Sequence, residues 1–265
     1  MKRKELAELY EIKKIEKNPI KLFKSFNFDR SLLFPIIIYA LFSITSNYIN
    51  YYFQETKFDE LITIISSFIG LLFTAYLVIS TLENKSDSKK TDILNMAICK
   101  VKPQLFTIIA EGIFAIPVAL LIVFLSMIPL LIVMTFTDIP ITYENNLFIG
   151  YIIGGLIFLS LMRYFFSTYI CIIHDVEGFD AVKLSTMFFK NNILLNIIIY
   201  ILFWGFIFLN YYLGMMMSNT VFLIIKVVLS SIISSVFIIF LSKIIMSGMI
   251  FTGGEKDSCL YDVVE

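Results

Sequence analysis

Charged side chains are scarce in this sequence. Asp, Glu, Lys and Arg make up 16% of the 265 residues, whereas a typical soluble domain has about a quarter. A water-soluble fold of this length would lack the polar surface needed to cover it. The 21 acidic and 21 basic residues balance, so no basic excess points to a nucleic-acid partner. These deficits exclude a soluble enzyme and a disordered chain.

Histidine and cysteine are also rare, with one His and three Cys. An odd number of cysteines without framework spacing predicts no disulfide architecture. Cys171 and His174 share a helix face, so a zinc site completed by Cys99 and Cys259 is conceivable, but closely paired ligands are missing. A polar helix end at the membrane interface is the favoured interpretation. We therefore expect no catalytic residues, no metal and no cofactor.

Apolar residues dominate instead, at 58% of the chain with a mean hydropathy of +0.86. A membrane-spanning helix needs roughly 20 mostly apolar residues. Six stretches qualify: 32–53, 61–82, 105–136, 147–173, 193–217 and 220–252. The sequence thus predicts an all-α, polytopic integral membrane protein with six transmembrane helices.

The distribution of Lys and Arg predicts the orientation. Of the 21 such residues, 17 lie before the first stretch, after the last, or in the loops on that same side. The opposite side holds only Lys57. By the positive-inside rule, both termini are cytoplasmic, as expected for the cell membrane. The predicted organisation is a cytoplasmic amphipathic segment at 1–30, a transmembrane domain at 31–252 and a cytoplasmic tail at 253–265.

Two cytoplasmic loops carry helical periodicity. In the first, residues 93–101 show an apolar stripe, and Pro103 is expected to end the helix. The second runs from Asp180 to Lys190, whose charges suit the two ends of a helix dipole. Its stripe consists of Ala181, Leu184, Ser185 and Phe188. Both segments are predicted to be short amphipathic helices in the membrane interface.

The second loop resembles a known pattern. The residues that carry it are Arg163, Tyr169, Asp175, Glu177, Gly178, Asp180, Ala181, Ser185, Lys190 and Asn192. They are similar to the membrane domain fused to some glycerophosphoryl diester phosphodiesterases and to related Yip1-like bacterial membrane proteins. Asn191 stands where the pattern usually has glycine. The resemblance implies a six-helix architecture, and without the soluble phosphodiesterase barrel it implies no hydrolytic site.

Two charged residues fall within predicted spans. Glu111 and Arg163 lie at depths of roughly 9 and 15 Å from the cytoplasmic side, at ~1.5 Å per residue. Because an ionisable group in hydrocarbon is costly and tends to find a partner, we expect the two to form an ion pair. Solvation of Glu111 at the interface, or a role in binding substrate or protons, are the alternatives.

Small residues at four-residue spacing predict close helix packing. Gly150 and Gly154 form one such pair, and Ser230 with Ser234 forms another. Small side chains let membrane helices approach closely. Packing inside one bundle is favoured over a homodimer face.

Together these features predict a non-catalytic membrane protein that acts as a scaffold or a transport-associated component. The expected partners are the lipid bilayer and a cytoplasmic or membrane protein, such as an ATPase or a lipid enzyme. The alternative is the permease subunit of an ABC-type exporter with a separate ATPase chain, in which the two loop helices act as coupling helices.

Overall fold

The computed structural model describes residues 9–15, 33–34, 36–42, 45, 59–82, 90–136, 153–216 and 220–252. The helices are α4 (Asp59–Leu82), α5 (Lys90–Phe136), α7 (Ser167–His174), α8 (Gly178–Asn191), α9 (Ile193–Met216) and α10 (Thr220–Gly248), with a 3-10 turn, η2, at Met162–Tyr164. Two short strands, β1 (Tyr10–Ile12) and β2 (Met249–Phe251), complete the elements. Residues 33–34, 36–42 and 153–161 are also helical. Gly150 and the predicted tail at 253–265 lie outside the described residues.

The helical, membrane-type character of the chain is confirmed. Four helical stretches in the described residues are long and apolar enough to cross a membrane: Ile64–Leu82, Asp92–Ile128, Ile153–His174 and Val228–Gly248. The bent pair formed by Gly178–Asn191 and Ile193–Phe206 brings the number to five if it counts as one span.

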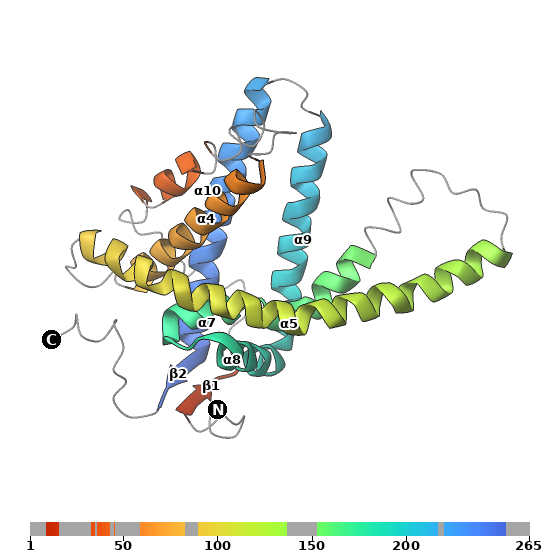
Figure 1. The fold of residues 1–265 in the computed structure, drawn as a ribbon, viewed down its shortest axis with the longest axis horizontal. Helices are drawn as coiled ribbons and strands as arrows, with labels where there is room; N and C mark the ends of the chain where they lie inside the picture. The colour runs from red at the N-terminus through yellow and green to blue at the C-terminus, as the bar shows by residue number, and fades with distance from the viewer. Residues whose placement is uncertain are drawn as a thin grey trace.

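Helix α5 differs from the prediction in length and direction. It runs without interruption through Pro103, Pro117 and Pro129, so the predicted separate helix at 93–101 is its first part. The expectation that Pro103 ends a helix is wrong. Proline is tolerated inside long apolar helices when neighbouring groups satisfy the freed backbone atoms. Figure 1 shows α5 running crosswise to α9 and α10, and it packs against α4, α7 and α8.

The predicted fourth span, 147–173, is interrupted. Its described part is helical over 153–161, tightens into η2 at Met162–Tyr164, and resumes as α7. Phe166 and Ser167 at the break are fully buried. A short 3-10 segment of this kind marks a change in helix geometry, and here it occurs at Arg163.

The predicted helix at 180–190 is confirmed as α8, but its apolar stripe faces protein. Ala181, Leu184, Ser185 and Phe188 are fully buried in the structure. α8 joins α9 through a 101° bend. The burial of the stripe against α5, α7 and α9 removes the argument that this stripe binds lipid.

Within the amphipathic segment predicted at 1–30, residues Tyr10–Ile12 form the strand β1. β1 pairs antiparallel with β2, with Tyr10 opposite Phe251 and Ile12 opposite Met249. α10 therefore ends at Gly248, before the predicted end of the last helix. Pairing satisfies backbone groups at the end of α10, and it places residues 9–15 beside the C-terminal end of that helix (Figure 1).

A close approach between helices occurs at Gly155, next to the predicted Gly154. At Gly154 an added Cβ would lie 3.8 Å from Trp204 of α9, and at Gly155 it would lie 3.2 Å from the Tyr200 hydroxyl. Tyr200 also donates to the Gly155 carbonyl at 3.1 Å. Ser230 is partly buried on α10.

Ser234 lines a largely apolar cavity of about 370 Å³ between α7, α9 and α10. Most of the other lining residues are aromatic or aliphatic, including Phe165, Phe203 and Phe237.

The close approach at Gly248 yields a stability prediction. A Cβ at Gly248 would lie 2.7 Å from Phe188 and 2.9 Å from Ile15, so Gly248→Ala overpacks the contact between the N-terminal segment, α8 and α10. We expect a loss of about 1 to 3 kcal/mol, measured as a lower Tm in detergent. Gly205→Ala is the matched control because nothing lies within 4 Å of its Cβ position. An equal or higher Tm for Gly248→Ala than for Gly205→Ala would contradict the docking of the N-terminal segment.

Candidate functional site

One face of α5 is polar and buried. Lys100, Gln104, Thr107 and Glu111 follow each other at spacings of four, three and four, which places them on one side of the helix. Lys100, Gln104 and Thr107 are at most 2% exposed, and Glu111 is partly buried. This face meets α7, α8 and the link between them. We call these four residues, with the groups they contact, the polar interface.

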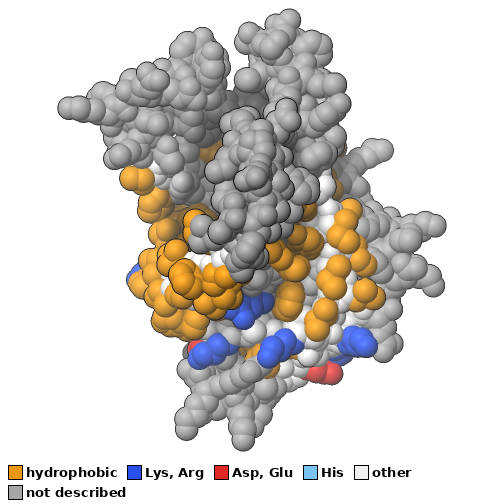
Figure 2. Space-filling model, turned by 90° about the vertical axis from the view of Figure 1, so that its right-hand side faces the viewer, with side chains coloured by type: hydrophobic (Ala, Val, Ile, Leu, Met, Phe, Trp, Pro, Cys, Tyr) orange, Lys and Arg blue, Asp and Glu red, His pale blue; other side chains and the backbone are white. Residues whose placement is uncertain are grey.

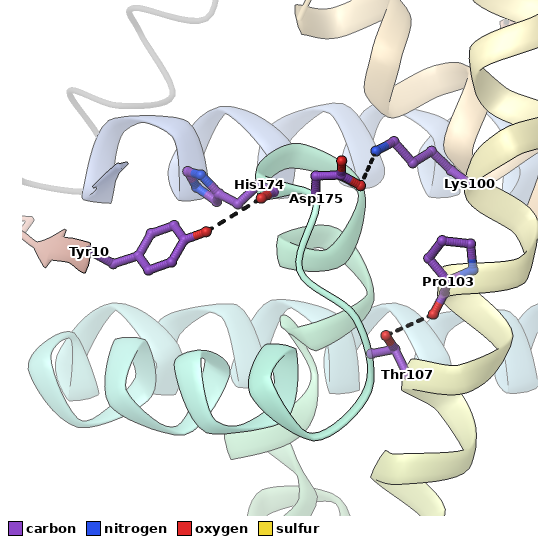
Figure 3. A network of polar contacts seen from close by, with 6 residues as sticks. All are labelled: Tyr10, Lys100, Pro103, Thr107, His174 and Asp175. Atoms are coloured by element: carbon purple, nitrogen blue, oxygen red, sulfur yellow. Dashed lines mark hydrogen bonds and ion pairs between the residues drawn. The ribbon is translucent and has the colours of Figure 1, made fainter. Parts of the chain in front are cut away.

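At one end of the polar interface, Lys100 and Asp175 form an ion pair (Figure 3). The Lys100 Nζ lies 2.5 Å from Asp175 Oδ1, and the two side chains are 3% and 29% exposed. Asp175 ends α7 in the left-handed conformation, with φ of 53°. Asp tolerates this conformation better than most residues, because its short polar side chain forms local hydrogen bonds. The left-handed turn releases the chain from α7, and the ion pair fixes it against α5.

In the middle, Thr107 joins three segments. Its hydroxyl donates to the Pro103 carbonyl at 2.9 Å and accepts a hydrogen bond from the Gly178 N–H at 3.0 Å (Figure 3 shows the bond to Pro103). The buried Cys171 thiol lies close to this hydroxyl. Gly178 has a φ of 60°, a conformation that glycine adopts without steric cost. The Thr107 hydroxyl therefore holds the start of α8.

At the other end, Glu111 contacts two hydroxyl groups. Ser167 and Thr168 both donate to Glu111 Oε1, Thr168 at 3.0 Å. Arg163 lies elsewhere, with its guanidinium 4.6 Å from the centre of the Tyr164 ring, in the range of a cation–π contact. In the described part of the chain, no ion pair joins Glu111 to Arg163, so the structure does not form the predicted pair.

The N-terminal segment reaches the same region. The Tyr10 hydroxyl donates to the His174 carbonyl at 3.4 Å (Figure 3), and the two rings meet edge to face at 5.5 Å. Asn192, at the junction of α8 and α9, accepts from the Ile15 N–H at 2.7 Å. Residues 10 and 15 thus contact the C-terminal end of α7 and the C-terminal end of α8.

The remaining residues of the resemblance pattern shape α8. Asp180 and Lys183 form an ion pair of 2.9 Å on its outer side. Ser185 is buried and donates to the Arg163 carbonyl at 2.8 Å, which joins α8 to the helix break. Glu177, before α8, and Lys190, in its last turn, are exposed.

The described residues contain no group of three or more His, Cys, Asp or Glu side chains that could hold a metal ion. Cys171 is buried, whereas Cys99 is exposed. Cys259 lies outside the described residues. The arrangement instead supplies one desolvated ammonium, two carboxyl groups and several fixed hydroxyls, which is a set for hydrogen bonding and charge pairing.

Comparison of the chain with protein-family models, with curated proteins and with solved structures finds no match. The similarity to the phosphodiesterase-linked membrane domain therefore stays a prediction.

Some residues of this site are predicted from the sequence and others are not. Asp175, Gly178, Ser185 and Glu111 were singled out, but Lys100, Gln104 and Thr107 were not. A signal was present, because polar residues recur at helical spacing from 100 to 111 beside a long apolar run. The expected helix end at Pro103 hides this signal, because it assigns Lys100 and Glu111 to two different helices.

The ion pair predicts an asymmetric response to mutation. Asp175→Asn leaves the nearly inaccessible Lys100 ammonium unpaired and should cost about 3 to 5 kcal/mol. Asn accepts the left-handed turn, so backbone strain stays small. Lys100→Met leaves a carboxylate that water partly reaches, so its cost should be smaller. The double variant should recover much of the loss, measured by thermal unfolding in detergent.

The surface pair provides the control for this experiment. Lys183→Met removes the ion-pair partner of Asp180 at a half-exposed site and should change stability by only ~1 kcal/mol or less. Two outcomes would show that Lys100 and Asp175 do not interact. In one, the double variant loses as much stability as the two single variants together. In the other, mutation of the buried pair and mutation of the surface pair have equal effects.

Proposed function

We propose that this chain is a multi-pass integral membrane protein that acts, without catalysis, as a scaffold or transport-associated component. It holds a second membrane-embedded protein through α5. The observation that carries the proposal is the exposure of that helix. In the most apolar 18-residue stretch of α5, only 6% of the residues are buried.

The exposed apolar residues of α5 form a continuous stripe. Ile109, Ile113, Ile116, Leu120 and Phe124 are between 54% and 66% exposed, and their spacing places them on one face of the helix. We call them the outer stripe. An apolar surface of this length is stable only against lipid or against another apolar surface. Because α5 runs crosswise to α9 and α10 (Figure 1), the outer stripe offers a partner a surface that differs in direction from the spanning helices.

The six-span topology with cytoplasmic termini belongs to the same proposal. The pairing of β1 with β2 supports termini on one side, because it joins residue 10 to residue 251. The charge distribution supports the cytoplasmic side. Figure 2 shows apolar side chains over the middle of one face and Lys and Arg side chains gathered below them, as expected where a membrane-embedded surface meets the cytoplasm.

A second candidate is the permease subunit of an exporter whose ATPase is a separate chain. α8 supports it, because this helix is held at 101° to α9 and carries the Asp180–Lys183 pair on its outer side. A short helix placed across the end of a membrane helix could transmit motion from an ATPase, as in the predicted coupling role.

Site-specific photo-crosslinking in intact membranes separates these functions. A photoreactive residue at position 113, 116 or 120 of the outer stripe should capture the same membrane protein, because all three positions face one way. The matched control is position 194 on α9, where Leu194 is 72% exposed; it should crosslink to lipid alone. A probe at position 183 of α8 should capture an ATPase only if the exporter alternative holds. Lipid adducts alone from all outer-stripe positions would contradict the scaffold proposal.

A further inference from the structure

Gln104 stands apart from the rest of the polar interface. Its side chain is 0% exposed, and neither its amide oxygen nor its amide nitrogen has a hydrogen-bond partner in the described part of the chain. A primary amide offers two donors and an acceptor with two lone pairs. Burying it without partners is costly, so native proteins supply partners, often as ordered water.

The position of Gln104 fits a connecting role. It lies one turn after Lys100 and one turn before Thr107, which are separated by ~10 Å along the helix at 1.5 Å per residue. That separation is too long for a direct hydrogen bond. The Lys100 ammonium has three donors, of which one is directed at Asp175. Unused hydrogen-bonding capacity therefore lies next to the unpartnered amide.

We propose that Gln104 binds buried water, and that this water joins the Lys100–Asp175 pair to Thr107 in one hydrogen-bonded path. A neutral ligand fits best, because the Lys100 ammonium disfavours a cation and the carboxyl groups of Asp175 and Glu111 disfavour an anion. Water both donates and accepts, and buried waters typically make about three hydrogen bonds to otherwise unsatisfied groups.

The path has a defined entrance and end. Asp175 is 29% exposed and marks the entrance, whereas Thr107, which is 0% exposed, marks the inner end. Along α5, Lys100 and Thr107 are ~10 Å apart, as estimated from seven residues at 1.5 Å each. Bound water thus connects the buried Thr107 hydroxyl to the side on which Asp175 is exposed.

The first test uses the sign of a stability change. Gln104→Met keeps the side-chain length and removes the hydrogen-bonding groups. If water satisfies the amide, the variant loses those bonds and its Tm falls by several degrees. If the amide is unsatisfied, the apolar replacement removes a penalty and Tm rises, which would overturn the proposal. Asn95→Met, at an exposed position of the same helix, is the control and should change Tm little.

The second test detects the water in the unmutated protein. X-ray pulses generate hydroxyl radicals from bound water, which oxidise nearby sulfur even in buried sites. Cys171 lies close to Thr107 and is 0% exposed, so bound water should make it oxidise several-fold faster than Met162, which is 1% exposed in the apolar core. Gln104→Met should reduce the Cys171 rate. A Cys171 rate as slow as that of Met162 would overturn the proposal.

Discussion

The ion pair between Lys100 and Asp175 is the interaction on which the arrangement of this protein depends. An ammonium that is almost wholly removed from water must have a partner, and only the left-handed end of α7 brings that carboxylate to α5. Once the pair forms, Gly178 reaches Thr107 and α8 begins in a new direction. The ion pair and the Thr107 bond together fix the link between α7 and α8 against α5.

Much of the helical content could be predicted from the sequence, because apolar runs of membrane-spanning length have few other stable conformations. α8 was also predictable, since its stripe has helical period. The direction of α5 could not be predicted, because hydrophobic periodicity indicates which face of a helix is buried but not which element covers that face. The strand pairing of Tyr10 with Phe251 depends on contacts between the two ends of the chain, which local sequence patterns do not record.

Local sequence patterns also do not predict which side chains meet in the candidate site. The resemblance pattern marked Asp175 and Gly178, but their partners lie more than 70 residues away in α5. Depth in the membrane suggested that Glu111 pairs with Arg163. The break at η2 changes the helix geometry at Arg163, and Glu111 meets the hydroxyls of Ser167 and Thr168 instead. Similar depth did not predict contact, because the prediction treats this helix as continuous where it is interrupted.

The central claim is that α5 is held against the α7–α8 segment through its polar face. Thr107→Cys tests it most directly, in a chain that keeps Cys171 and carries serine in place of Cys99 and Cys259. Because the Thr107 hydroxyl lies close to the Cys171 thiol, mild oxidation in membranes should form a disulfide between positions 107 and 171. Ile109→Cys, on the exposed face of α5, should not form one. Equal cross-linking at both positions, or none at position 107, would contradict the account.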